Sequence, residues 1–527
     1  MRVSVVTHWV SIVSGVALAV FLLATAKLAS LERSAPHHAD VVVEGGIPVT
    51  LYLPGDGSGG SGFQSPPPPD ERPPALVLAH GFAGDRRSVS SAARRLAASG
   101  YAVLAPDLRG HGENRNPHTP SRAQSDHFFS DLAAAVDFLR ASPYVDGSRI
   151  AVAGHSMGAG AALDYSTRDS GIDAVVLVSG GWSLNGPYPP PNALFLYAER
   201  DPKRIRERCD RLAARIAGRP GVERARTYGD LATGTGVRVV EIPGANHASI
   251  LWTDAAVGEI VSWLDAVFGI ERPKGPLPDD PRLRLVAVMG LCILLLMPGL
   301  GVLVGRLVPA AAEPSASGRW AGLAALLGAL AVTMPLLAVG SPLAIVPLEA
   351  VDMVVSYLAL AGVSLLVLFA LRDGPGPASL ASRPLPALVA SGVALLALVA
   401  LLHPTSVVLH RAALTPERTL AFVTTTLALL PFSLSLQLSL RRGPPVTATA
   451  FAAAGRVLVV LVLILGIRVG VLGGVLAFVL GPLVLVFVLV EVVAAAVYAT
   501  SRNLLTIALV DASWLALVLA ASMPIRW

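Results

Sequence analysis

Charged residues are scarce in this sequence: they make up 15% of its 527 positions, against roughly 25% in an ordinary soluble domain. The shortage is uneven, because residues 283–527 hold only 20 charged side chains and the first 282 positions hold 57. This imbalance excludes a single soluble globule and a disordered chain. It predicts one soluble domain joined to a membrane domain.

Lysine and cysteine are also rare, with three lysines and two cysteines. The net charge of +5 comes from scattered arginines, without the Lys/Arg block that signals nucleic-acid binding. Cys209 and Cys292 lie in different parts of the chain, which argues against a disulfide scaffold. The sequence has neither a cluster of metal ligands nor a glycine-rich phosphate loop. We therefore expect no cofactor, no metal and no nucleic-acid partner.

Four segments follow from composition along the chain. We predict an N-terminal transmembrane anchor, a soluble domain, a short proline-rich linker and a transmembrane helical domain, at residues 1–35, 36–270, 271–282 and 283–527. In the first segment, the apolar run from Trp9 to Ala26 is about long enough to cross a bilayer. Ala24-Thr25-Ala26 also fits a signal-peptidase site, and we favour an uncleaved signal anchor.

The soluble segment alternates between strand and helix patterns. After a predicted hairpin at 40–53 with Gly45-Gly46 at its turn, a Gly, Ser and Pro loop occupies 54–74. Strands are then predicted at 75–79, 101–105, 149–153, 174–179, 193–197 and 237–241, and helices at 88–99, 126–141, 157–168, 203–217 and 253–268. Apolar strands that alternate with helices predict an α/β fold, a mostly parallel sheet covered on both faces.

The C-terminal segment is a series of apolar stretches separated by arginine and proline clusters. We predict about eight membrane-spanning helices, near 284–306, 319–340, 350–371, 386–402, 418–440, 454–474, 476–499 and 503–523. Positively charged loop residues favour the cytoplasm. With the amino terminus inside, the inner loops hold nine arginines and the outer loops four. The expectation is a multi-pass protein with its soluble domain outside the cytoplasm, although Lys27, Arg33, Arg282 and Arg284 argue the other way.

The sharpest motif is Gly154-His155-Ser156-Met157-Gly158. It lies between the strand predicted at 149–153 and the helix predicted from 157, which is the context of a G-x-S-x-G nucleophile elbow. In that turn the serine is strained, and its Oγ lies over a helix N-terminus that favours negative charge. Ser156 is therefore the candidate nucleophile.

A serine nucleophile needs a base, and the base needs an orienting acid. In enzymes with this elbow the chain order is Ser, acid, His. His247 follows the strand predicted at 237–241 and is the sole histidine between 156 and 402. Asp201 follows the strand at 193–197 and is favoured as the acid over Glu199, with Asp230 third. Both loops lie where open α/β sheets place their sites.

An oxyanion hole requires two backbone N–H donors. We expect one from Met157, directly after the nucleophile, and one from Phe82 in the loop His80-Gly81-Phe82-Ala83-Gly84. His80 is expected to hold that loop rather than to transfer protons.

These motifs together resemble the α/β-hydrolase superfamily, near its dienelactone hydrolase, lysophospholipase and serine aminopeptidase-like branch. The similar segments are His80-Gly81-Phe82, Asp107-Leu108-Arg109-Gly110-His111-Gly112, the elbow, Asp201 and His247, within 36–270. The resemblance implies an acyl-enzyme on Ser156 and a structural loop at 107–112. Ala198 replaces a common glycine before the acid, which leaves Asp201 open. Many members of the family insert a helical cap between the strands predicted at 174–179 and 193–197. This chain has only the segment from Gly180 to Asn192 there.

Two charge patterns fall outside this motif set. The helix predicted at 203–217 is rich in arginine, and either a solvated face or a surface for anionic lipid fits it. Arg468, Glu491 and Asp511 lie within predicted apolar spans. An ionised group there costs free energy unless it is paired or lies in a water-filled cavity. An ion pair, a displaced helix end and a transport pathway are the alternatives.

The sequence therefore predicts a membrane-anchored serine hydrolase that cleaves an ester, with a lipid or amphiphile among the candidate substrates. The partners expected are that ester and the lipid bilayer. An acyltransferase with the same triad is one alternative, and peptide cleavage is not excluded by the residues. A transporter-like membrane protein with a non-catalytic hydrolase-fold domain is the other alternative.

Overall fold

The computed structural model describes residues 2–33, 38–55, 65–118, 123–182, 184–273, 275–338, 345–373, 384–409, 414–473, 476–477 and 480–526. Residues 56–64 of the predicted polar loop and Gly474 of the predicted break between the last spans lie outside these ranges. The chain divides into two compact units. A helical unit comprises Met1–Thr25, Ala287–Thr405 and Ala412–Ile525, and a sheet unit comprises Ala26–Val286, Ser406–Arg411 and Arg526–Trp527.

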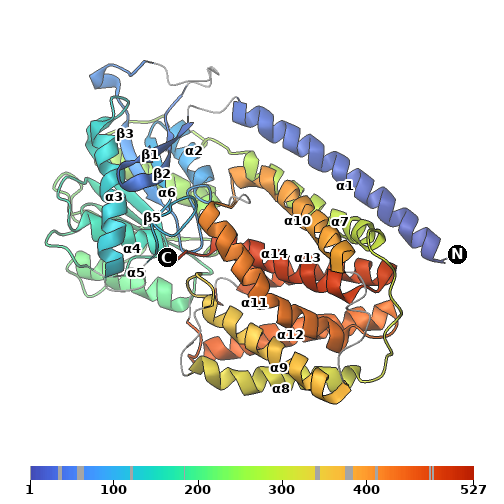
Figure 1. Cartoon of the computed structure of the whole chain (residues 1–527). Helices are drawn as coiled ribbons and strands as arrows, with labels where there is room; N and C mark the ends of the chain where they lie inside the picture. Colours follow the sequence, from blue (N-terminus) through green and yellow to red (C-terminus); the bar gives the residue numbers. More distant parts are fainter. Residues whose placement is uncertain are drawn as a thin grey trace. The chain divides into compact units, whose positions relative to one another are not determined.

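The described strands of the sheet unit form one nine-stranded sheet in the order β1-β2-β4-β3-β5-β6-β7-β9-β8. Figure 1 labels β1, β2, β3 and β5 of this sheet. The strands are β1 (His38–Val43), β2 (Ile47–Tyr52), β3 (Pro74–Ala79), β4 (Ala102–Pro106), β5 (Asp146–His155), β6 (Ala174–Val178), β7 (Ala193–Ala198), β8 (Thr227–Tyr228) and β9 (Val237–Ile242). From β4 to β9 the neighbours pair in parallel, whereas β1, β2 and β8 pair antiparallel. The predicted mostly parallel sheet is confirmed. The two-residue β8 was not predicted, since so short a strand has no periodicity.

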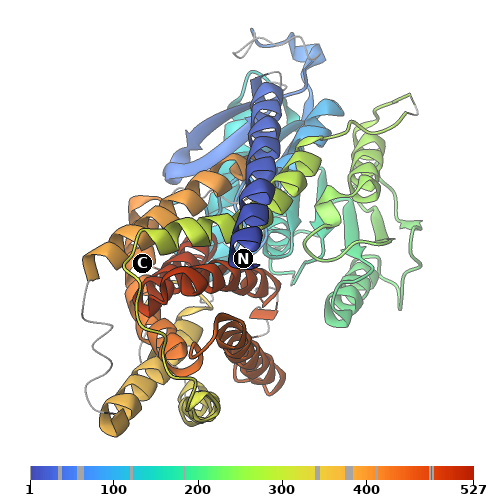
Figure 2. The same ribbon diagram turned by 90° about the vertical axis from the view of Figure 1, so that its right-hand side faces the viewer.

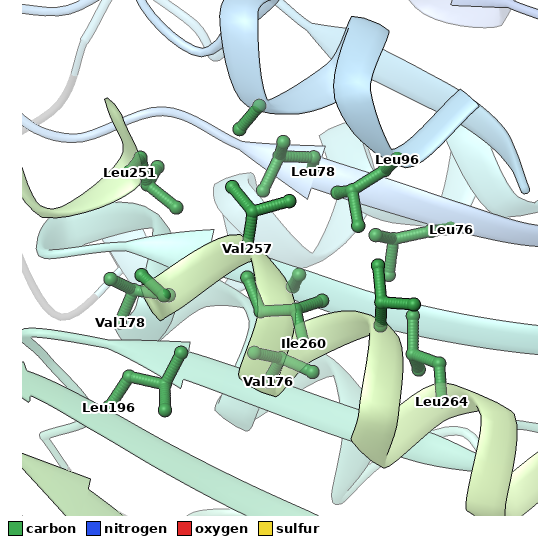
Figure 3. Packing of buried hydrophobic residues seen from close by; sticks show 14 of the residues in the cluster. Leu76, Leu78, Leu96, Val176, Val178, Leu196, Leu251, Val257, Ile260 and Leu264 are labelled. Carbon is green, nitrogen blue, oxygen red and sulfur yellow. The ribbon is translucent and has the colours of Figure 1, made fainter. Parts of the chain in front are cut away.

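Helices cover both faces of the sheet. On one face, α2 (Ser90–Ala98) and α6 (Asp254–Phe268) pack on alternate strand residues such as Val176 and Val178. Figure 3 shows Val257, Ile260 and Leu264 of α6 pointing into this core. Their spacing of three and four residues gives α6 one apolar face.

The opposite face carries α3 (Ala123–Ala141), α4 (Met157–Ser166) and α5 (Lys203–Ile216). Leu177 points to this side because it alternates with its neighbours in β6. Leu163 of α4 and Leu212 of α5 lie beside it near Gly181. The parallel strands are thus buried on both sides, which explains their continuous apolar sequences.

The described part of the C-terminal region confirms a helical region of long apolar helices. They are α7 (Arg282–Arg306), α8 (Arg319–Ala338), α9 (Asp352–Asp373), α10 (Pro384–Leu402), α11 (Pro416–Leu440), α12 (Pro445–Arg468), α13 (Leu480–Ser501) and α14 (Leu504–Ser522). α12 begins well before the predicted 454, because Pro444 and Pro445 start the helix ahead of its most apolar part. Within the helical unit, α11 lies beside α9 and α14 (Figures 1 and 2).

Eight helices among the described residues are long and apolar enough to cross a membrane, including α1 (Arg2–Arg33) over His8–Arg33. α8 contributes a shorter apolar helix, Arg319–Pro335. These helices suggest a multi-pass membrane protein.

Four charged residues in or next to the apolar helices form an ion-pair network: Arg441, Arg456, Glu491 and Asp511. Arg456 of α12 contacts Glu491 of α13 at 3.0 Å and Asp511 of α14 at 2.9 Å. Arg441, fully buried after α11, contacts Glu491 at 2.6 Å. Arg468 is the last residue of α12. Of the alternatives for these residues, the structure thus shows ion pairs for Glu491 and Asp511 and a helix end for Arg468.

Candidate active site

Ser156 occupies the sharp turn between β5 and α4. Its backbone has φ 52° and ψ −110°, a region that residues other than glycine rarely adopt. The flanking glycines are required by space. A Cβ on Gly154 would come within 2.1 Å of the Gly158 backbone, and one on Gly158 within 2.5 Å of the carbonyl oxygens of Ala79 and His80. The strand–turn–helix context predicted for the elbow is present.

Ser156, His247 and Asp201 meet at the carboxyl ends of β5, β9 and β7. The Ser156 Oγ lies 3.0 Å from His247 Nε2. The His247 Nδ1 lies 2.6 Å from Asp201 Oδ1. The structure therefore brings together the three side chains that the sequence analysis selected, although 45 residues or more separate neighbouring members.

Asp201 is a buried and well-bonded carboxylate, at 3% exposure. Its Oδ2 accepts hydrogen bonds from the Ser179 hydroxyl at 2.6 Å and the Ala198 N–H at 2.8 Å. Burial by itself raises the pKa of Asp201, but the hydrogen bonds from His247 and Ser179 outweigh it and hold the pKa below its ordinary value. The carboxylate thus stays ionised beside His247.

The rival acids lie elsewhere. Glu199 accepts a hydrogen bond from the Gly244 N–H at 2.7 Å and is exposed. Asp230 is also exposed and caps its own turn through the Ala232 N–H. The geometry thus favours Asp201 as the partner of His247.

His155 contributes a contact that the sequence analysis did not identify. Its Nε2 donates to the His247 backbone carbonyl at 2.8 Å, and the two imidazole rings lie 4.9 Å apart between centroids. Burial, together with the charge of His247, lowers the pKa of His155 to about 4. His155 is the variable residue before the nucleophile in G-x-S-x-G, and the motif by itself assigns it no role.

The expected oxyanion loop lies against the elbow. A Cβ on Gly81 would come within 2.8 Å of His155 Nδ1, so the loop that carries Phe82 runs beside the turn that carries Met157. His80 joins two loops, since its Nδ1 bonds the Gly81 carbonyl at 2.8 Å and its Nε2 accepts the Leu108 N–H at 3.1 Å. This is the holding contact expected for His80.

The loop at 107–112 is held by its own polar contacts. Asp107 is fully buried, pairs with Arg86 and accepts the Arg86 N–H at 2.7 Å and the Glu113 N–H at 2.8 Å. These contacts fit the structural role expected for this loop.

The segment between β6 and β7 is irregular, with bends and no helix, over its described residues, 179–182 and 184–192. Within it, Trp182 is 43% exposed. Over the described ranges of the chain, no group of three or more His, Cys, Asp or Glu side chains is placed to hold a metal ion.

Comparisons with known proteins agree with this geometry. Residues 70–209 match the family described as serine aminopeptidase, S33. An uncharacterized protein of Mycobacterium tuberculosis is 31% identical over 110 residues, 20% of this chain and 29% of that protein. The monoacylglycerol lipase of Mycolicibacterium smegmatis is 35% identical over 113 residues, 21% of this chain and 39% of the lipase. Cutinase 2 of Thermobifida cellulosilytica is 27% identical over 195 residues, 36% of this chain and 66% of the cutinase.

The chain spans less than a third of the length of the Mycobacterium tuberculosis relative. The family match, at residues 70–209, lies within the sheet unit. The chain contains an α/β-hydrolase domain, followed by a helical C-terminal region with several long apolar helices.

Proposed function

We propose that this protein is a membrane-anchored serine hydrolase of the esterase or lipase type, acting through an acyl-enzyme on Ser156. One observation carries the proposal: the chain of contacts from Ser156 Oγ to His247 Nε2 at 3.0 Å and from His247 Nδ1 to Asp201 at 2.6 Å. Both distances are those of hydrogen bonds.

In the proposed reaction, Ser156 Oγ attacks the acyl carbon while His247 Nε2 takes its proton. The N–H groups of Met157 and Phe82 stabilise the negative oxygen of the tetrahedral intermediate. His247 then protonates the leaving alcohol, and the acyl group stays on Ser156. Water attacks this ester in the second half, with His247 as the base. Asp201 holds the imidazole tautomer and stabilises its charged form.

An ester is the substrate class we favour. Two relatives are named for ester cleavage, a monoacylglycerol lipase and a cutinase. The apolar helices that flank the domain along the chain support a substrate that partitions into lipid, such as an amphiphile. The family name also favours a peptidase as a second candidate. Turnover of an aminoacyl amide, assayed beside an ester, distinguishes a peptidase from an esterase.

The nucleophile is tested by covalent labelling of the purified full-length protein with a fluorophosphonate probe. Ser156→Ala should abolish labelling, whereas Ser130→Ala, at an exposed position of α3, should label like the wild type. Undiminished labelling of the Ser156 variant would remove it as the nucleophile.

The base is tested by turnover of a short soluble ester. His247→Ala should lower kcat by at least about 10³-fold, since catalytic triads lose that much or more when the base is removed. A loss below tenfold would contradict the role of His247 as the base.

Adding an acceptor alcohol tests for acyl transfer, because an acyltransferase would form the new ester in place of the free acid.

We also propose that the hydrolase domain lies outside the cytoplasm, on the nine-to-four arginine distribution of the loops. Protease digestion of the domain in intact cells supports this placement, and digestion only after lysis contradicts it.

A further inference from the structure

Helix α5 presents a basic stripe to solvent. Six basic residues of α5 and its C-terminal continuation are exposed, against one exposed acid, Glu207; the basic residues are Lys203, Arg204, Arg208, Arg211, Arg215 and Arg219. Four of them, at 204, 208, 211 and 215, recur at intervals of four, three and four, which places them on one face over about 16 Å of helix. A different face of α5 is apolar and buried, through Ile205, Cys209, Leu212 and Ala213.

The acids of α5 are fewer than its basic residues. Glu207 lies 3.6 Å from both Lys203 and Arg211, so one carboxylate serves two cations. Asp210 is partly buried and accepts a hydrogen bond from the Tyr197 hydroxyl at 3.1 Å. The six exposed basic residues thus outnumber the acids of α5, so the stripe carries a net positive charge.

This stripe adjoins the candidate active site. α5 starts two residues after Asp201. The Arg208 guanidinium lies 4.8 Å from the Trp182 ring centroid, and a Cβ on Gly160 of α4 would come within 2.2 Å of Trp182. Trp182 therefore connects the stripe to the helix that begins at the nucleophile. An exposed tryptophan beside arginines is also the combination that proteins place at a membrane interface.

The connectivity of the chain brings lipid within reach. The domain begins at β1, a few residues after the end of α1, and ends at α6, fourteen residues before the start of α7. Both flanking helices are long and apolar enough to cross a membrane. Encounter with lipid headgroups is then intramolecular, so an individually weak electrostatic contact becomes effective.

We propose that the α5 stripe, with Trp182, is a docking surface for anionic lipid headgroups, and that docking brings the Ser156 site to ester substrates held in the bilayer. This proposal rests on the proposed hydrolase function for its catalytic readout. Anionic headgroups complement six exposed cations. The attraction acts over about one Debye length, 8–10 Å at moderate salt, so it weakens as salt increases.

The test uses the full-length protein in nanodiscs of neutral phosphatidylcholine, with or without about 30% phosphatidylglycerol. Two esters are compared, a short soluble one and a long-chain one dissolved in the bilayer. Anionic lipid should raise kcat/KM for the bilayer ester by at least about tenfold and leave the soluble ester unchanged. The double variant Arg211→Glu/Arg215→Glu should lose this rise, and 0.5 M salt should reduce it in the wild type.

The matched control is Arg211→Lys/Arg215→Lys, which keeps the charge and should keep the rise. Loss of the rise in the lysine variant as well would show a structural effect and overturn the proposal, as would an undiminished rise in the glutamate variant. A rise of the same size from soluble polyglutamate in neutral nanodiscs would also overturn it, in favour of an acidic protein partner.

A second readout does not depend on catalysis. A fluorophore is attached at Arg219→Cys, with Cys209→Ala and Cys292→Ala removing the native thiols, and quenching by brominated lipid is measured. Docking predicts stronger quenching with anionic than with neutral lipid, and its loss on adding Arg211→Glu/Arg215→Glu. Equal quenching in both lipids overturns docking, whereas lipid-dependent quenching without ester turnover upholds it and contradicts only the hydrolase function.

Discussion

At the scale of single residues, the candidate site depends on two histidines with opposite requirements. In the proposed reaction His247 must accept and release a proton, so it has to charge during turnover. His155 lies against it, 4.9 Å away between ring centroids, and bonds its backbone carbonyl. With its pKa lowered to about 4, His155 stays neutral at neutral pH. It can therefore support the base without competing for the proton.

His155 also gives a pH dependence of stability with a definite sign. An unfolded histidine titrates near 6.5, whereas the folded His155 titrates at about 4. Between these values the unfolded chain binds a proton that the folded chain does not, so stability is full above about pH 6.5 and is lost as pH falls towards 4.

The variant His155→Gln keeps an N–H donor but does not titrate. Its thermal unfolding midpoint should fall less than that of the wild type between pH 7 and pH 4.5. Parallel curves for the two proteins would contradict the assigned pKa.

At the scale of elements, the elbow is a close-packed junction of β5, α4 and the end of β6. Gly180, just after β6, lies under the nucleophile, where a Cβ would come within 2.4 Å of the Ser156 carbonyl oxygen. The Ser156 backbone is held between β5 and α4, and Gly180 directly follows the region of β6. The two backbones therefore cannot move apart freely. Small residues are needed on the neighbouring segment as well as in the motif.

The packing at Gly180 predicts the effect of one added methyl group. Gly180→Ala should destabilise the fold by about 1–3 kcal/mol, as overpacking does, and should lower ester turnover at least about tenfold by displacing Ser156. Gly221→Ala is the matched control, because a Cβ there would meet nothing within 4 Å. Thermal unfolding and ester assays measure both, and equal behaviour of the two variants would refute the argument.

At the scale of the whole molecule, the helical unit buries charge among its apolar helices. It buries Arg441 and Arg456 and pairs them with Glu491 and Asp511. A buried ion pair costs desolvation, but removing one partner leaves an uncompensated charge and costs more, about 3–5 kcal/mol. The network therefore makes the arrangement of α11 to α14 sensitive to each of its members.

Asp511→Asn tests this role of the network. It should lower the thermal stability of the helical unit strongly, while detergent-solubilised protein keeps its turnover of a soluble ester. Glu313→Gln is the control, because its pair with Arg502 is exposed and such pairs contribute about 1 kcal/mol or less. The transporter-like alternative predicts the reverse, with biological function lost in Asp511→Asn and spared in Ser156→Ala.

The sequence by itself determined the features that local pattern carries. Apolar strand patterns that alternate with helix patterns predicted the parallel sheet, and long apolar stretches predicted the helices of the C-terminal region. The glycines around Ser156 predicted the elbow. The acid and base were also within reach, because parallel strands deliver their following loops to one edge of the sheet. That rule selected His247 and favoured Asp201 over Glu199 from the sequence.

Only the tertiary structure decided which side chains far apart in the sequence come into contact. It chose Asp201 over Glu199 by the direction of two side chains in one loop, and it placed His155 under His247 and Gly180 under Ser156. It also paired Arg456 with two acids from other helices. These contacts join residues far apart in sequence, and local periodicity carries no information about which side chains meet once the elements pack.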